Sequence, residues 1–212
     1  MYKEAMKMQT DKNIRHLGYH STSFETRSDD NGMYIEGYFA VFNSAYEVYA
    51  GCTEMVAPEA FNNTLGGDIK ALCDHDTRLV LGRSKAGTLE LRVDSHGLWG
   101  RITINPNDSD AVNLYERVKR GDVDQCSFGF EIVSEDTEFR DDGTVHFTIR
   151  EVKLYEVSVV TFPAYTETSV SARKHDVAEI KKRKLDAWKI TTRARLKGEK
   201  NGTESTDAAQ TD

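Results

Sequence analysis

The chain is predicted to fold as a mixed α/β protein that is mainly β, with a closed, mostly antiparallel β-barrel flanked by helices. Three observations predict this class. Short stretches of alternating apolar residues recur between residues 20 and 162, turn signals rich in Asp, Asn and Gly separate them, and two stretches look helical. A chain of 212 residues suits one such domain with an appendage.

Local patterns define the elements in chain order. Residues 1–18 are polar without a clear period, which predicts a loosely ordered lead-in. The Asn31-Gly32 pair predicts a hairpin between strands at residues 20–27 and 33–42, because Asn-Gly is a strong hairpin-turn signal. Pro58, after a strand end, predicts the start of a short helix. Further strands are expected at residues 69–73, 88–93, 98–104, 126–133, 145–150 and 152–162.

The clearest helix is predicted over residues 107–120. Asn107 or Ser109 is a candidate N-cap, and Gly121 ends the helix. An apolar stripe follows helical spacing and consists of Val112, Tyr115 and Val118. We therefore expect a polar helix that is followed, after a short turn, by the strand that begins at Cys126.

Charge divides the chain into two regions. From Arg173 to the end there are 11 Lys/Arg and 7 Asp/Glu residues, a net charge of +4, which leaves −11 for residues 1–172. The acidic body argues against nucleic-acid binding. We expect a lead-in at residues 1–18, a folded domain at 19–172, and a charged helical tail at 173–212 whose final segment has a disordered composition.

Cysteine usage and apolar runs indicate the compartment. The three cysteines are far apart and leave one unpaired in any disulfide scheme, which fits a reducing environment. No apolar run is long enough to span a bilayer, and the N-terminus lacks the apolar core of a signal peptide. The chain is expected to be soluble and cytoplasmic, with no membrane partner.

Ser127 is the first residue that could carry chemistry. In the predicted strand, Cys126, Phe128 and Phe130 share one face, while Ser127 lies on the other beside Gly129. The missing side chain at Gly129 would leave room for an approaching ligand. Ser127 is thus either a nucleophile or a small polar residue hydrogen-bonded inside the barrel.

His75 and Glu156 are the other two candidates. His75 follows a short strand and is placed to accept a proton near neutral pH, or it is a surface-loop histidine between two aspartates. Glu156 lies in a strand that reads as buried on both faces, where an unpaired carboxylate costs several kcal/mol. A hydrogen bond from a histidine N–H would offset this cost. Alternatively, the carboxylate faces a gap filled with solvent, or it pairs with Lys153 or with an arginine.

Together, these three candidates would supply the groups of a serine hydrolase triad: a nucleophile (Ser127), a base (His75) and a carboxylate that orients the base (Glu156). No Gly-x-Ser-x-Gly motif is present, so an α/β-hydrolase is not expected. Cys126 is a competing nucleophile, although its face reads as core. A metal site is not expected, because Cys52, Cys73, His75 and Cys126 offer no closely spaced ligand pair, and no glycine-rich phosphate loop indicates a cofactor.

An ordered series of segments between residues 22 and 172 resembles the prohead (capsid maturation) serine proteases of tailed bacteriophages, a family related to herpesvirus assemblin. The segments are Glu36-Gly37-Tyr38-Phe39-Ala40-Val41-Phe42, Val56-Ala57-Pro58-Glu59-Ala60-Phe61, His75-Asp76 with Leu81-Gly82-Arg83, Asp94 through Leu98, residues 121–130, and residues 156–164. The chain departs from the family at Glu59, where the family often has glycine.

The resemblance implies an assemblin-like fold and a serine endopeptidase that acts through an acyl-enzyme. It implies Ser127 as nucleophile and His75 as base, and position suggests Glu156 as third member, where assemblin-like enzymes have a second histidine. Oxyanion donors are expected near Thr161 and Phe162. The implied substrates are the scaffolding segment of the major capsid protein, that protein's N-terminal region, and the protease itself, inside the assembling prohead in the host cytoplasm.

A homo-oligomer is a further expectation, as is the absence of a nucleic-acid partner or a cofactor. Because its charge is reversed and its apolar content is low, the segment Arg173–Asp212 is expected to dock to acidic components of the shell interior or to be removed by self-cleavage. The alternative to an enzyme is a non-catalytic β-barrel protein that binds scaffold or capsid subunits during assembly. Both hypotheses predict the same fold, so only chemistry separates them.

Overall fold

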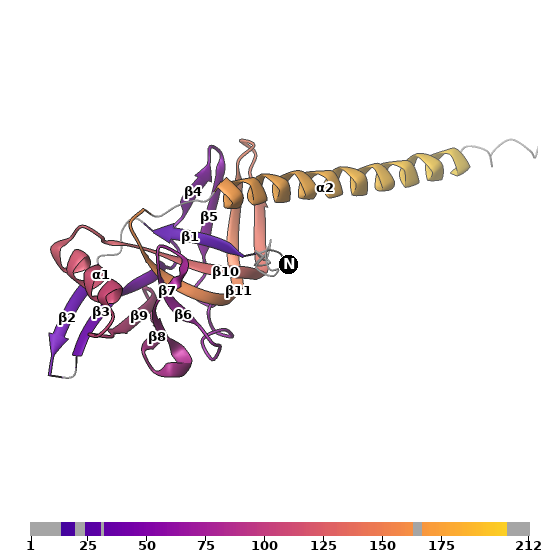
Figure 1. The fold of residues 1–212 in the computed structure, drawn as a ribbon. Coiled ribbons are helices and arrows are strands. Elements are labelled where there is room, and N and C mark those ends of the chain that lie inside the picture. Colours follow the sequence, from indigo (N-terminus) through magenta and orange to yellow (C-terminus); the bar gives the residue numbers. More distant parts are fainter. Residues whose placement is uncertain (1–13, 20–23, 31, 163–166, 203–212) are drawn as a thin grey trace, which may run out of the picture. The chain divides into compact units, whose positions relative to one another are not determined.

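The computed structural model describes residues 14–19, 24–30, 32–162 and 167–202 (Figure 1). The chain divides into two compact units, Met1–Val170 and Ser171–Asp212. The first unit contains the two β-sheets, and the second holds most of one long helix. Among the described residues, no helix is both long and apolar enough to cross a membrane.

The larger sheet has seven strands and is organised around one long strand, β11 (Val145–Val160). On one side β11 pairs antiparallel with β10 (Gln125–Phe139), which in turn pairs with β1 (Arg15–Tyr19). On the other side the first half of β11 pairs in parallel with β5 (Cys52–Val56), and its second half pairs in parallel with β6 (Lys70–Cys73). The remaining strands pair with β5 and β6 and are β4 (Tyr46–Tyr49) and β7 (Asp76–Arg83).

The smaller sheet has four antiparallel strands in the order β2-β3-β9-β8. Their bounds are β2 (Glu25–Asp29), β3 (Gly32–Val41), β9 (Gly97–Ile104) and β8 (Leu89–Val93), with a 3-10 turn, η1 (Ser84–Ala86), before β8. The predicted hairpin around Gly32 and the predicted pair of strands at 88–93 and 98–104 are thus confirmed, while residues 20–23 lie outside the described part. β7 and β4 were not predicted.

The apolar faces of the two sheets form one core. Phe128 on β10 lies edge-on to Phe61, with ring centroids 5.5 Å apart, and stacks on Phe130 at 4.7 Å. Cys126 Sγ donates to the backbone carbonyl of Tyr38 on β3 at 3.1 Å. These close contacts fix the face of β10 that packs into the core. Ser127, the neighbour of Cys126 and Phe128 in the strand, therefore projects from the opposite face.

The prediction of a closed β-barrel is wrong. Among the described strands, the two sheets are joined by one isolated bridge, Phe42 to Val56. The edge strands are β1, β4 and β7 in the larger sheet and β2 and β8 in the smaller one. A barrel requires its first and last strands to pair in a continuous stagger. Because β11 changes partner from β5 to β6 along its length, the sheet branches instead of closing.

Helix α1 (Ser109–Arg120) confirms the strongest helix prediction, with a corrected start. Its N-cap is Asp108, whose carboxylate accepts from the backbone N–H of Asp110 and Ala111, and not Asn107 or Ser109. Gly121 ends the helix with a φ of 85°. The buried stripe, which packs toward β2 and β3, is Ala111, Leu114, Tyr115 and Val118.

Two further expectations need correction. The short helix expected at Pro58 is absent; successive backbone turns run from Ala57 to Gly67 instead, each closed by a bond between residues three apart. Residues 15–18 of the expected lead-in belong to β1, whereas residues 1–13 lie outside the described part. The second error arises from a tertiary contact, because the β1 strand forms its hydrogen-bonded ladder with the distant β10.

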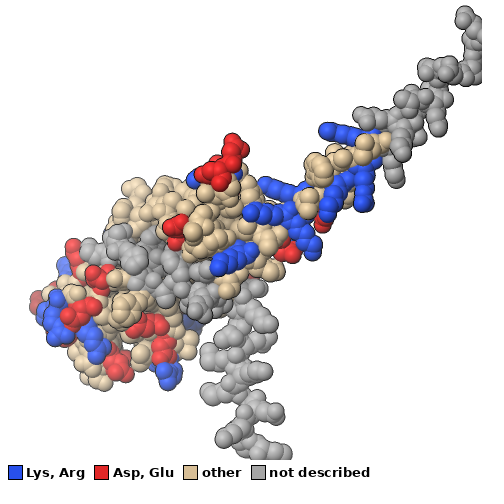
Figure 2. All heavy atoms as spheres, turned by 90° about the horizontal axis from the view of Figure 1, so that it is seen from above, with Lys and Arg blue, Asp and Glu red and all other residues tan. Residues whose placement is uncertain are grey.

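Helix α2 runs from Glu167 to Gly202 and includes the charged segment 173–197. Lys and Arg side chains gather along it (Figure 2). Val177 is buried, but most of the helix's larger apolar side chains are strongly exposed, as at Trp188 and Ile190. A helix with so thin an apolar stripe contributes little buried surface.

Candidate active site

Strand β10 places Ser127 on the face opposite the core, as predicted from the alternation. Cys126, Phe128 and Phe130 are buried in the core, and Ser127 is also fully buried, on the other side of the strand. Across the pairing with β11, Ser127 lies opposite Ser158 and Gly129 lies opposite Glu156. Residues directly opposite in an antiparallel pair project to the same face, so these four positions form one patch.

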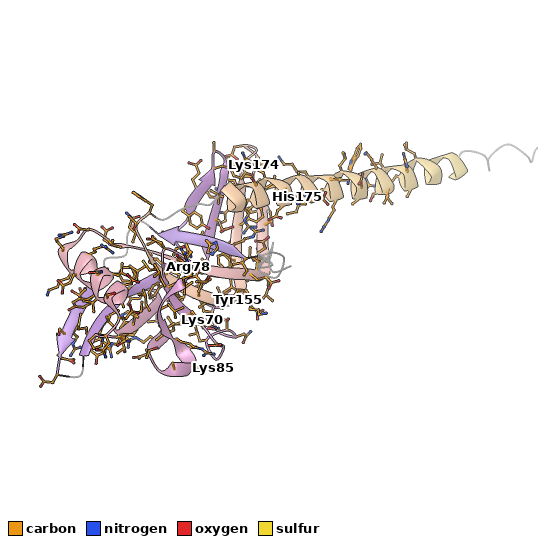
Figure 3. The ribbon with its side chains drawn as sticks, in the orientation of Figure 1. Lys70, Arg78, Lys85, Tyr155, Lys174 and His175 are labelled. Atoms are coloured by element: carbon orange, nitrogen blue, oxygen red, sulfur yellow. The ribbon has the colours of Figure 1, made fainter. Side chains whose placement is uncertain are left out.

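A β-bulge turns Glu156 toward this patch. Gly129 pairs with Glu156 but Phe130 pairs with Leu154, so Tyr155 is an extra residue on β11. The bulge lets both Leu154 and Val157 face the core while Glu156 projects away from it. In Figure 3 the labelled Tyr155 and Lys70 mark the location on β11 and β6, since Tyr155 precedes Glu156 and Lys70 lies opposite it.

The Glu156 side chain is 10% exposed, and its carboxylate is hydrogen-bonded at both oxygens. Its Oε1 lies 2.8 Å from His75 Nδ1, and its Oε2 accepts from Ser158 Oγ at 2.6 Å. A carboxylate can only accept, so Nδ1 of His75 carries the proton and a neutral His75 keeps Nε2 as its acceptor. Of the alternatives open for Glu156, pairing with a histidine is the one found.

His75 is held by an unusual turn after β6. Asp74 and His75 both adopt the left-handed region, with φ of 48° and 59°. The Asp74 carboxylate accepts from the backbone N–H of Thr161 at 2.7 Å and from its hydroxyl at 3.1 Å, which anchors the turn to the end of β11. Two successive residues in this region persist only where surrounding contacts enforce them, and such turns concentrate at functional sites.

This anchoring concerns Thr161, one of the two residues near which oxyanion donors are expected. The N–H of Thr161 is bonded to Asp74 and Phe162 is strongly exposed. The Thr161 N–H therefore positions the histidine turn, and it is not available to a substrate carbonyl.

Two buried polar atoms in the described residues lack a hydrogen-bond partner at this site. They are Oγ of Ser127 and Nε2 of His75. Buried polar atoms are nearly always bonded, so each exception calls for an explanation. A hydroxyl that can donate and an imidazole nitrogen that can accept are chemically complementary.

His16 is a site residue that sequence reasoning missed. It lies on β1 opposite Gly129; its Nε2 is 3.6 Å from Glu156 Oε1, and its ring centroid is 4.1 Å from that of His75. Burial lowers the pKa of His16, as does the neighbouring His75, and Glu156 opposes the shift. The polar stretch around His16 has no strand periodicity, so only the pairing of β1 reveals its position.

Gly129 has a different role from the one expected. A Cβ built on it would lie 2.3 Å from Glu156 Oε1 and 3.0 Å from the carboxyl carbon. The missing side chain makes room for the Glu156 carboxylate rather than for an approaching ligand.

Under the triad expected from the sequence, Gly129→Ala should lower kcat/KM for peptide cleavage by about 100-fold, because a displacement of about 1 Å at a triad group has this order of effect. The added methyl must push the carboxylate away from His75. Steady-state kinetics on a peptide substrate measures the loss. Gly66→Ala is the matched control, since a Cβ there meets nothing within 4 Å; an equal loss in both variants would contradict the steric role of Gly129.

Cys126, the competing nucleophile, is fully buried on the core face, and its thiol donates to backbone carbonyls of β3. Cys52 is buried as well. The pKa of the Cys73 thiol is raised to about 11, mainly by burial and to a lesser extent by the negative charge of Asp74. The thiolate is the reactive form, so at pH 8 only about one Cys73 thiol in a thousand is reactive.

We therefore expect the folded protein to resist iodoacetamide at pH 8 and to keep, during the treatment, the peptide-cleaving activity that the sequence resemblance implies. Mass spectrometry should show full alkylation of all three cysteines only after unfolding. Rapid inactivation together with a modified Cys126 would restore the cysteine as a candidate nucleophile.

Several known proteins are similar to this chain over most of its length. A family model described as caudovirus prohead serine protease matches residues 22–183. The prohead protease of Enterobacteria phage HK97 is 27% identical over 165 residues, covering 76% of this chain and 69% of the relative; that of Escherichia phage T5 is 27% identical over 174 residues, covering 79% and 77%. The solved bacteriophage T4 capsid assembly protease superposes over 70% of this chain and 98% of its own, with 11% identity and a TM-score of 0.45.

Proposed function

The chain belongs to the caudovirus prohead serine protease family, and on that premise we propose that it cleaves peptide bonds with Ser127 as nucleophile, His75 as general base and Glu156 as the carboxylate that orients the base. It is a protease of phage prohead maturation. The observation that carries the residue assignment is the buried Glu156–His75 hydrogen bond, which directs the unbonded Nε2 of His75 away from the carboxylate.

The position of Ser127 supports its assignment as nucleophile. It lies opposite Ser158, whose hydroxyl donates to the same carboxylate that holds His75. Residues directly opposite have Cβ atoms about 5 Å apart, so Ser127 is one strand away from the Glu156–His75 pair. Its unpaired hydroxyl is the group that His75 would deprotonate.

In the proposed reaction, His75 Nε2 accepts the proton of Ser127 Oγ as that oxygen attacks the scissile carbonyl. The imidazolium is stabilised by the ionised Glu156. It then gives the proton to the leaving amine, and the C–N bond breaks to leave an acyl-enzyme. Water, activated by the same nitrogen, hydrolyses the ester and restores Ser127.

We propose as substrates the scaffolding segment and N-terminal region of the major capsid protein, cut inside the assembling prohead in the host cytoplasm. The relatives in HK97 and T5 are both named prohead proteases. We extend the proposal to the chain itself: residues 19–172 form the protease domain, and the basic tail 173–212 is removed by self-cleavage. Intact-mass measurement after incubation tests the last point, and a Ser127→Ala protein that loses the same residues would refute it.

Covalent labelling tests the nucleophile directly. A fluorophosphonate probe should form a bond between its phosphorus and Ser127 Oγ with loss of fluoride, and peptide mapping should place the label on Ser127. Ser158, opposite Ser127 and equally buried, is an internal control. Label on Ser158, or undiminished labelling in a folded His75→Ala variant, would contradict the assignment.

A further inference from the structure

Three side chains at this site have the chemistry of a metal-binding group. Among the described residues, His16, His75 and Glu156 each offer a ligand atom, and these atoms all lie within 4.8 Å of one another. They come from β1, from the turn after β6, and from β11. The side chains are 26%, 19% and 10% exposed, so the group is partly shielded yet reachable from solvent.

The spacing fits one small cation. Ligand atoms around a tetrahedral zinc ion, each 2.0–2.2 Å from the metal, lie roughly 3.3 Å from one another. His75 Nδ1 and His16 Nε2 are 2.8 Å and 3.6 Å from Glu156 Oε1, on either side of that value. The two imidazole nitrogens lie within 4.8 Å of each other, so binding of a tetrahedral ion requires them to approach by at most about 1.5 Å.

We infer that His16, His75 and Glu156 form a site for a divalent transition-metal ion, best matched by Zn²⁺, and that the bound ion holds the protease inactive. The inference rests on the proposed function for its effect on catalysis. Two imidazoles and one carboxylate select Zn²⁺ over Mg²⁺ or Ca²⁺, which prefer oxygen ligands. Three protein ligands leave the fourth position to water.

Ser158 supplies the support that such sites usually have. Its hydroxyl donates to Glu156 Oε2, the oxygen that faces away from the histidines, and fixes the carboxylate with Oε1 toward them. Hydrogen bonds to a ligand from outside the metal shell orient it and contribute about 10- to 100-fold in affinity.

Inactivation follows from the proton on His75. In the metal-free site Nδ1 carries it and Nε2 is the acceptor. An ion bound at Nδ1 displaces that proton, and the neutral imidazole takes one up at Nε2 from solvent, so no net proton is lost. Nε2 is then a donor and cannot accept the proton of Ser127. The ion therefore withdraws the base without covalent change, and its removal restores activity.

Calorimetric titration of full-length Ser127→Ala protein with Zn²⁺ tests the site without requiring activity. We expect one ion per chain, and a four-coordinate visible spectrum when Co²⁺ replaces Zn²⁺. Adding His16→Gln should weaken binding about 10-fold or more. The matched control is His96→Gln, a histidine in an exposed turn outside the group, which should bind Zn²⁺ like the parent. Circular dichroism in chelator confirms that each variant folds.

Equal affinity in the His16→Gln and parent proteins, or equal losses in the two histidine variants, would overturn the site. The wild type then reports on function: Zn²⁺ should stop peptide cleavage at the concentration that saturates binding, and a chelator should restore it. Binding without any effect on cleavage would overturn the inhibitory role. A wild type that binds the ion but never cleaves would refute the proposed function while leaving the metal site intact.

Discussion

Replacing Ser127 with alanine is expected to abolish processing of the capsid protein, with a fall in kcat of roughly 10⁶-fold, the order found when a hydrolase loses its nucleophile. The fold should survive. Ser127 is fully buried and its hydroxyl has no hydrogen-bond partner, so the substitution removes an unsatisfied polar group and leaves stability equal or higher. Co-expression with the cognate capsid protein, followed by gel analysis and thermal unfolding, measures both effects.

Ser158→Ala is the control that separates chemistry from packing. It removes an equally buried hydroxyl from the opposite position, but one that is bonded to Glu156. We expect it to lower the free energy of unfolding by about 2 kcal/mol, because the lost bond is to a buried carboxylate, and to reduce cleavage far less than Ser127→Ala does. If wild type, Ser127→Ala and His75→Ala all leave the capsid protein uncut, the non-catalytic assembly hypothesis replaces the protease.

The catalytic candidates were accessible to sequence reasoning because each depends on a local pattern. Alternation along β10 separates Ser127 from the core residues Cys126 and Phe128, and the structure confirms that separation. The nearly all-apolar strand around Glu156 predicts burial, and burial of a carboxylate predicts a partner. The partner proved to be His75.

Features that depend on which strands meet could not be predicted in this way. Pairing of β1 with β10 brings His16 to Glu156, although residues 14–19 carry no periodic signal. The same limitation explains the failed barrel, since local patterns define strands and faces but not the order of strands at an edge. The bulge at Tyr155 is a third case: it depends on a register shift against β10.

Replacing Glu156 with glutamine is expected to lower kcat by about 10⁴-fold with little change in KM, the order of effect seen when the triad carboxylate of a serine protease becomes an amide. Glutamine keeps the shape but has no charge to stabilise the imidazolium. Its amide nitrogen can also donate to His75 Nδ1, which favours the tautomer with the proton on Nε2 and removes the base. Steady-state kinetics on a peptide spanning a processed junction gives kcat and KM separately.

The matched control is Glu131→Gln on β10, which removes a carboxylate that accepts from the Tyr155 hydroxyl at 2.9 Å, next to Glu156 in the chain. Both variants lose one negative charge from the same pair of strands, so a general electrostatic effect would lower both activities alike. A deficit confined to Glu156→Gln isolates the contact with His75. Because Ser158 can still donate to the amide oxygen of the introduced glutamine, that side chain should stay in place and KM should hold. If kcat instead stays within about tenfold of wild type, the orienting role fails and Glu156 is a buried structural partner of His75 alone.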